Sequence, residues 1–193
     1  MFRSSVVGVD SGVPQLTTAR LILRRWREED RAPFAAMNAD PEVMWDLGGP
    51  LDQDASDRKL ERFDTAFERN GYGRWVIIGE LGDDGQAFLG YAGIMASRGE
   101  HPLGDHEDMG WRLRRDAWGH GFASEAARAV LDDAFSRVGL EEVLAYTAPD
   151  NHRSQAVMER LELRRDPSRD FEAHYDDVGV WRGLVWVATA PSW

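Results

Sequence analysis

The chain has 193 residues, a formal net charge of −11 and no cysteine. This length suits one domain over 1–193 with a full core, in which 1–15 form a loose tail or an extra edge strand. The missing cysteines exclude disulfides, thiolate metal sites and a cysteine nucleophile, and no apolar run approaches the roughly 20 residues of a membrane helix. Nucleic acid needs a basic face, so we expect a cytoplasmic protein that binds neither nucleic acid nor a membrane. The acidic balance either attracts cationic substrates or simply keeps the protein soluble.

In the N-terminal half, the spacing of apolar residues predicts strands at period 2 and helices at period 3.6. Asp40-Pro41 is typical of a helix start, and Gly71 and Gly73 of a helix end. Gly90 and Gly93, inside a strand, indicate a bulge or close packing. The expected elements are a strand over 16–26, helices over 28–38 and 54–68, and strands over 75–81 and 87–95 joined by a turn at Asp83-Asp84-Gly85.

The stretch 97–107 is polar and holds His101 and His106. A metal site there would need a third ligand at suitable spacing, and the pattern H-E-x-x-H is absent. We therefore expect a surface loop and no metal.

The most informative stretch is 108–128, D-M-G-W-R-L-R-R-D-A-W-G-H-G-F-A-S-E-A-A-R. It predicts a strand, a tight turn with Gly119 and Gly121, and the start of a helix at Phe122. The first N–H groups of a helix have no internal partner, and glycines before them let an anionic ligand approach the backbone. We interpret the turn as a diphosphate site. The alternative is a strand–helix turn that needs glycine only for its shape.

The remaining elements complete the predicted sheet. The helix that starts at Phe122 runs to about Val138 and ends at Gly139. A strand over 142–148, a helix through about Leu161, a polar acidic segment over 165–177 and a last strand over 178–188 follow. This order implies a mixed sheet with a parallel pair at its centre.

Three motifs carry a resemblance that covers about 16–186. W-G-H-G-F-A-S-E-A resembles the acyl-CoA-binding turn [QR]-x-x-G-x-[GA] of the GNAT N-acyltransferases, although Asp116 stands where Gln or Arg is usual. The D-P-E-V-M run at 40–44 and Trp118 before the first glycine are similar to the branch of ribosomal-protein N-terminal acetyltransferases. The third motif, N-H-R-S at 151–154, resembles the family's N-x-x-S helix start.

The resemblance implies an α/β fold of the GNAT type: a mixed, mostly antiparallel sheet, a splayed central parallel pair formed by 107–114 and 142–148, and helices on both faces. It also implies acetyl-CoA (coenzyme A) as cosubstrate, with a local basic zone around the turn. The cofactor-binding residues it implies are Leu113, Arg114, Gly119, His120, Gly121, Phe122, Ala123, Ser124 and Asn151.

By the same resemblance, Ser154 lies near the thioester sulfur and donates a proton or binds the thiolate. The alternatives are a plain first-turn serine at 154 and plain helix capping by Asn151. Many family members have a tyrosine acid where this chain has Met158, which cannot donate.

Asp108 matches the place of a strand carboxylate in the family and is the candidate base, directly or through a water. The alternative is a solvated acidic loop end. Its neighbour Glu107 points to the opposite face. Candidate acceptor-side residues are Trp45, Phe171 and His174.

The function implied is transfer of an acetyl group to a primary amine, a protein N-terminus or a small molecule, by direct attack on the thioester in a monomer or homodimer. One alternative is a non-catalytic acyl-CoA-binding or sensing module on the same fold. Another is an interaction domain that no longer binds coenzyme A, against which the intact G-H-G turn and Asn151 argue.

Overall fold

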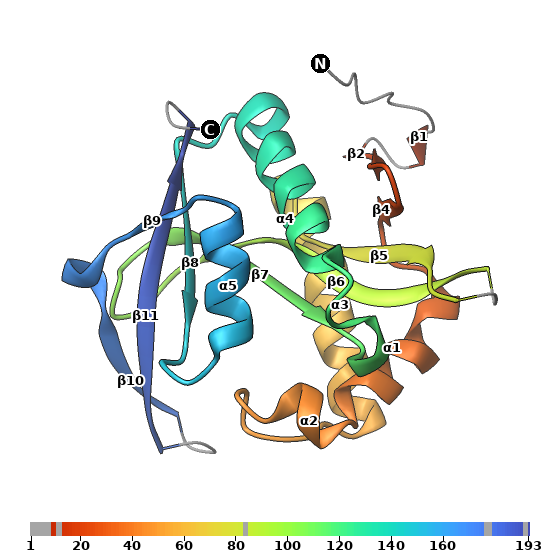
Figure 1. The fold of residues 1–193 in the computed structure, drawn as a ribbon, viewed down its shortest axis with the longest axis horizontal. Coiled ribbons are helices and arrows are strands. Elements are labelled where there is room, and N and C mark those ends of the chain that lie inside the picture. Colours follow the sequence, from red (N-terminus) through yellow and green to blue (C-terminus); the bar gives the residue numbers. More distant parts are fainter. Residues whose placement is uncertain (1–8, 11–12, 83–84, 176–178, 191–192) are drawn as a thin grey trace.

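The computed structural model describes residues 9–10, 13–82, 85–175, 179–190 and 193 (Figure 1). The predicted turn at Asp83-Asp84, most of the predicted N-terminal tail and the predicted start of the last strand at Val178 lie outside the described residues. Of the tail, Val9–Asp10 (β1) and Val13–Pro14 (β2) form a small antiparallel pair.

One large sheet organises the molecule, with strand order β10-β11-β8-β7-β6-β5-β4-β3 and β9 paired to β11. All neighbours are antiparallel except β7 and β8. The strands are β3 (Leu16–Thr17), β4 (Leu21–Arg24), β5 (Arg74–Glu80), β6 (Gln86–Ser97), β7 (His106–Leu113), β8 (Glu142–Thr147), β9 (Arg164–Arg165), β10 (Phe171–Tyr175) and β11 (Gly179–Thr189).

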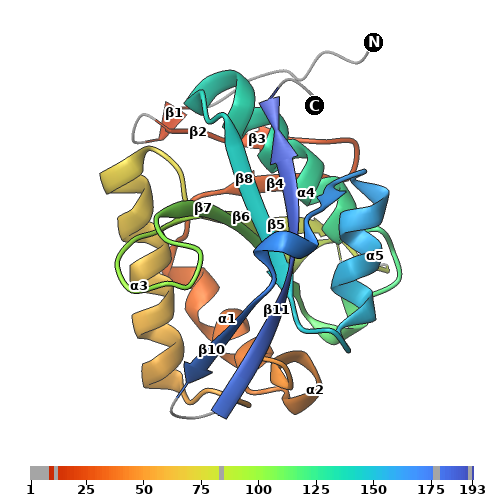
Figure 2. The same cartoon turned by 90° about the vertical axis from the view of Figure 1, so that its left-hand side faces the viewer.

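Helices cover both faces of this sheet, as predicted (Figure 2). The helices α1 (Arg31–Asn38) and α3 (Gln53–Asn70) lie on one side, and α4 (Phe122–Asp133) and α5 (His152–Arg160) on the other. The short helix α2 (Pro41–Met44) lies at the bottom of this view. Short turns of helix stand at η1 (Glu28–Asp30), η2 (Arg115–Ala117), η3 (Ala134–Val138) and η4 (Pro167–Arg169). No helix among the described residues is long and apolar enough to cross a membrane.

Local chemistry sets several element ends. The Asp40 carboxylate accepts a hydrogen bond from the Glu42 N–H at 2.9 Å, which confirms the predicted helix start. The α3 helix ends at Gly71, whose φ of +75° is the left-handed conformation that favours glycine. The predicted strand over 16–26 is divided, because residues between Thr17 and Leu21 turn back and pair β3 with β4.

The central parallel pair is short. Only Asp108 with Leu144 and Met109 with Ala145 are in register among the described residues. Beyond them β7 stays paired with β6 alone, and β8 with β11 alone. The two strands therefore separate from Gly110 and Tyr146 onward, which confirms the predicted splayed pair and the predicted fold class.

A bulge in β6 confirms the interpretation of its glycines. The register with β5 shifts between Ile77 and Ile78, opposite Gly90, whose φ is +145°. A Cβ on Gly90 would collide with the Arg112 carbonyl, and one on Gly93 with the Gly73 carbonyl. Both positions thus need glycine for close approach of neighbouring backbones.

Two expectations for the loops are corrected. The segment 165–177, expected only as polar and acidic, contains the end of β9, η4 and β10. Both strands pair with β11, and Phe171 of β10 is buried. The surface loop expected over 97–107 is shorter, since β6 runs to Ser97 and β7 starts at His106.

Candidate functional site

Two cavities meet where β7 and β8 separate. The larger, of about 1000 Å³, lies among α3, β7 and β8, and we call it the large cavity. The smaller, of about 560 Å³, is lined by the Gly119–Gly121 turn and α5, and we call it the turn cavity. Four residues line both: Asp46, Trp111, Arg112 and Ser154.

The glycine turn has the shape that its sequence predicts. Gly119 and Gly121 have φ values of +82° and +80°, so the shape of the turn requires glycine. Gly121 is also the N-cap of α4 and provides no capping side chain. The first N–H groups of α4 therefore have no side-chain cap, and the buried Ser124 hydroxyl has no partner in the described part of the chain.

An ion pair that the sequence did not reveal holds this turn. The Arg20 guanidinium donates to the His120 carbonyl at 2.9 Å and pairs with Glu125 at 2.6 Å. Burial works to raise the pKa of Glu125, but hydrogen bonds from Thr18 and Arg20 hold it below its ordinary value. Arg20, in the loop before β4, thus holds the first turn of α4 through the ionised Glu125 carboxylate.

The predicted cofactor residues divide into two groups. Leu113, Gly119, Gly121, Phe122, Ala123, Ser124 and Asn151 line the turn cavity. His120 is exposed and stacks on Phe122 with ring centroids 5.6 Å apart. Arg114 pairs with Asp116 at the surface and donates to the Phe88 carbonyl, so it lies outside the cavity wall. Arg153, stacked over the Trp118 ring at 4.1 Å, adds a cation to that wall.

Asn151 connects the two sides of the splayed pair. Its Oδ1 accepts from the Ser154 N–H at 3.0 Å, so it caps α5. Its Nδ2 donates to Asp46 at 2.6 Å, and Asp46 pairs with Arg112 on β7 at 3.0 Å. Sequence reasoning missed Asp46 and Arg112 as partners, because no local pattern relates residues on a loop, a strand and a helix.

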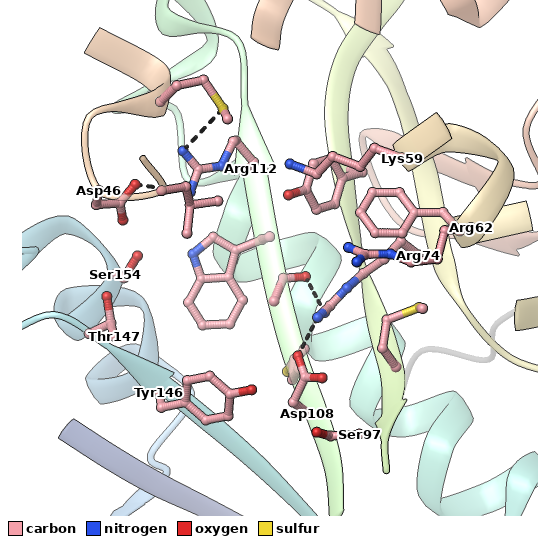
Figure 3. A pocket seen from close by; sticks show the side chains of 18 of the residues that line it. Asp46, Lys59, Arg62, Arg74, Ser97, Asp108, Arg112, Tyr146, Thr147 and Ser154 are labelled. Atoms are coloured by element: carbon pink, nitrogen blue, oxygen red, sulfur yellow. Dashed lines mark hydrogen bonds and ion pairs between the residues drawn. The ribbon is translucent and has the colours of Figure 1, made fainter. Parts of the chain in front are cut away.

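The wall contributed by β8 and α5 carries hydroxyl groups. Figure 3 shows Ser154, Thr147 and Tyr146 on the same side of the large cavity, across from Lys59 and Arg62. Met158 also lines this cavity but is buried, with 2% of its surface exposed, and it offers no proton. Sequence reasoning missed Tyr146, whose alternating strand pattern indicated packing alone.

The two neighbouring carboxylates at the start of β7 have different surroundings. Asp108 lines the large cavity and pairs with the buried Arg74 through one oxygen, Oδ2 (Figure 3). Glu107 instead binds Tyr72 at 2.7 Å and Arg98. Burial and the Glu107 carboxylate raise the pKa of Tyr72 above its ordinary value. Only Asp108 of the two contributes to the cavity wall.

The three candidate acceptor-side residues lie apart from one another. Trp45 is 46% exposed and lines the turn cavity. Phe171 is buried behind the large cavity, 5.3 Å from the ring of Tyr146 and 5.6 Å from that of Trp181. His174 is exposed on β10 and lines neither cavity. Their assignment to the acceptor stays a prediction.

Among the described residues, no group of three or more His, Asp or Glu side chains is placed to hold a metal ion. His101 and His106 pack edge to face, 4.7 Å apart, against Tyr146 and Phe171. Burial, and then the neighbouring His106, lower the pKa of His101 below its ordinary value.

Comparison with known proteins gives consistent results. A family model described as acetyltransferase (GNAT) domain matches residues 20–164. The protein YkkB of Bacillus subtilis (strain 168) is 33% identical over 150 residues, which are 76% of this chain and 83% of that protein. FsC-acetyl coenzyme A-N(2)-transacetylase of Aspergillus fumigatus is 34% identical over 152 residues, 75% of this chain and 63% of that longer protein.

Solved structures share the fold. The acetyltransferase from Agrobacterium tumefaciens (strain C58) superposes with a TM-score of 0.73 at 28% identity, covering 95% of this chain and 99% of the other. Mycobacterium smegmatis RimJ, solved in complex with CoA-disulfide, gives a TM-score of 0.66 at 22% identity, covering 89% and 83%.

Proposed function

Because this chain belongs to the GNAT acetyltransferase family, we propose that it transfers the acetyl group of acetyl-CoA to a primary amine held in the large cavity. The predicted family is confirmed, and with it an acetyl-CoA-dependent acyltransferase. The proposal rests on one observation: two cavities meet at Ser154 and Trp111. One cavity can hold the acetyl donor and the other the acceptor.

Coenzyme A fits the turn cavity. The diphosphate would accept hydrogen bonds from the uncapped first N–H groups of α4 and from the orphaned Ser124 hydroxyl, with the helix dipole favouring its charge. Arg153 and Arg160 supply positive charge at the wall. Arg114 and His120, although predicted for this role, would contribute at most from outside the cavity.

The acceptor would enter the large cavity and reach the acetyl group at the four shared residues. Bound acetyl-CoA supplies a thioester whose carbonyl carbon is attacked by the amine while the thiolate leaves. In our proposal Asp108, whose Oδ1 is outside the Arg74 pair, takes the proton from the amine, and Ser154 gives a proton to the departing sulfur. Asn151 holds the first turn of α5, and so Ser154, in place.

An amine acceptor agrees with the names of relatives. The Aspergillus relative is named for acetyl transfer from coenzyme A to N(2) of FsC. A structure titled as a ribosomal-protein-serine acetyltransferase from Vibrio cholerae shares the fold at 16% identity. We propose a small-molecule amine or a peptide N-terminus, because a cavity of about 1000 Å³ admits either.

The proposal is tested first by calorimetric titration with acetyl-CoA, using two matched variants. Gly121→Trp and Gly139→Trp both place a side chain at a left-handed glycine, the first at the start of α4 with φ of +80° and the second after η3, which continues α4, with φ of +78°. Only the first variant fills the turn cavity. We expect binding by the native chain and by Gly139→Trp, and loss of binding in Gly121→Trp.

If both variants bind acetyl-CoA equally well, the assignment of the coenzyme A site to the glycine turn is wrong. Binding without acetylation of any amine in a broad panel would support the alternative of a non-catalytic acyl-CoA module, which the methionine at position 158 favours.

A further inference from the structure

Three cations on one face of α3 line the large cavity without an acidic partner. Arg58, Lys59 and Arg62 all contribute to its wall, and in the part of the chain that the structure describes none lies within 4.0 Å of a carboxylate. The other arginines of this wall differ: Arg74, Arg98 and Arg112 pair with Asp108, Glu107 and Asp46. The chain has 34 acidic residues against 23 Lys and Arg, so missing counter-charges are a local feature.

Charge is segregated around α3. Four carboxylates of this helix point away from the cavity: Asp57 and Glu61 pair with Arg31, and Asp64 and Glu68 pair with Arg25. The carboxylates at i, i+4, i+7 and i+11 thus occupy one helix face, and the three cations another. The helix presents only positive charge to the cavity.

The pKa values of two neighbouring groups, Lys59 and Tyr91, are affected by the positive charges around them. Burial lowers the pKa of Lys59 below its ordinary value; the charge of Tyr91 opposes this shift, and the fields of Arg112, Arg62 and Arg74 add to it. Burial works to raise the pKa of Tyr91, yet Lys59, Arg112 and Arg74 bring it below its ordinary value. The fields of Arg112 and Arg74 lower the pKa of both groups, which agrees with a positive potential at this end of the cavity, where a bound anion would be stabilised.

We infer that the acceptor is an amine that also carries an anionic group, a carboxylate or a phosphate, bound at Lys59 and Arg62. This inference rests on the proposed function. Figure 3 shows these two side chains on the side of the large cavity away from Ser154 and Thr147. An anion held there leaves the amine end of the molecule directed toward the four shared residues, so the cations select and orient the acceptor.

The test compares matched amines that differ only in a remote anion. A dipeptide with a free C-terminal carboxylate is compared with its C-terminal amide, and 3-aminopropyl phosphate with 3-aminopropanol. Acetylation is followed as kcat/KM and binding by calorimetry in the presence of coenzyme A. We expect at least one anionic compound to exceed its neutral partner by about tenfold or more. The pair that responds distinguishes carboxylate from phosphate.

Two variants on the cavity wall and one control assign the effect. Lys59→Gln and Arg62→Gln should each remove most of the preference for the anion, measured as the ratio of kcat/KM for the anionic compound to kcat/KM for its neutral partner. Arg69→Gln removes one charge from the same helix outside the cavity wall and should retain the preference.

The outcomes separate the two proposals. Neutral partners that bind and react as well as the anionic ones overturn the anionic acceptor and leave acetyl transfer to an amine intact. If the anion preference survives in Lys59→Gln and Arg62→Gln, the anion is bound elsewhere and not at these two side chains. Failure to bind acetyl-CoA overturns the proposed function, whatever the anions do.

Discussion

At the scale of single residues, two hydroxyl groups compete for the proton transfer to sulfur. Ser154 lines both cavities, whereas Tyr146 lines the large cavity only. Ser154→Ala should lower kcat at saturating substrate by about 100-fold, because in our proposal this hydroxyl protonates the departing thiolate. The affinity for acetyl-CoA should change little, since Asn151 still caps the helix through the backbone N–H of residue 154.

Tyr146→Phe is the matched comparison in steady-state kinetics. It retains the ring that packs on Phe171 and removes only the hydroxyl. A kcat that is unchanged in Ser154→Ala and falls in Tyr146→Phe would transfer the role to the tyrosine.

Residues whose local structure follows from neighbours in the chain were predictable, although their function stays a prediction. Gly121 and Asn151 act through local backbone geometry, so a motif of a few residues describes them. Arg20, Asp46 and Lys59 depend on partners more than 30 residues away or on a cavity assembled from several elements. A single sequence contains no periodic signal for such contacts. The roles of Asp108, Trp45, Phe171 and His174 stay predictions.

At the scale of elements, the connection between β6 and β7 contains a titratable packing contact. The Nδ1 of His101 accepts a hydrogen bond from the Leu103 N–H at 3.1 Å, which requires this nitrogen to be unprotonated. The ring also packs against Phe171, with centroids 4.9 Å apart. Protonation would remove this acceptor and place a charge in an aromatic cluster.

This contact predicts a pH dependence of stability. The pKa of His101 is lower in the folded chain than the value of about 6.5 expected when unfolded, so the unfolded state binds more protons as the pH falls. Stability should therefore be complete above about pH 6.5 and decrease below it. The melting temperature should fall between pH 7.5 and 5.5, and by less in His101→Asn, which retains an acceptor that does not titrate.

His174→Asn is the control, because His174 is exposed on β10. If His101→Asn and the native chain lose the same number of degrees over this pH range, another group causes the effect.

The elements also show where pattern reading succeeds. Helical and alternating spacings located α3, α4, β5 and β8 within a few residues, because burial on one face imposes those periods. The β10 strand was missed since its sequence, F-E-A-H-Y, buries only Phe171 strongly among the residues whose burial is described. Pairing with β11 rather than local preference forms that strand.

At the scale of the whole molecule, few backbone pairs join the two halves of the sheet at their centre. Two register pairs and the Arg112–Asp46–Asn151 contacts connect β7 with β8 and α5. A ligand that contacts both α4 and α5 should therefore stabilise the assembly as a unit. Acetyl-CoA at 100 times its Kd adds about 2.7 kcal/mol to the free energy of unfolding. For a chain of this size that raises Tm by roughly 5–10 °C.

Thermal unfolding with and without acetyl-CoA measures this shift, and Gly121→Trp supplies the comparison. The variant should melt lower than the native chain because of backbone strain, and should gain little from the ligand. An equal gain in the variant would mean that the stabilising site lies elsewhere.

The net charge of the chain did not predict the positive charge on the wall of the large cavity. The value of −11 predicted either attraction of cations or simple solubility. Four carboxylates of α3 pair with Arg25 and Arg31 on one face, while three of its cations, Arg58, Lys59 and Arg62, line the cavity. A total charge cannot report this separation, because it depends on which helix face meets the sheet.

Because the two cavities share only four of the described residues, substitutions in one cavity can change its ligand preference while leaving the other cavity unchanged. Residues 42–48, β7 and α5 contribute to both cavities, but α3 lines only the large cavity, our proposed acceptor site, and the glycine turn lines only the turn cavity, our proposed donor site. Substitutions along α3 can therefore alter the preferred acceptor while the glycine turn and α5 keep the donor unchanged. In our proposal, a new acceptor preference can therefore begin with substitutions in this one helix of 18 residues.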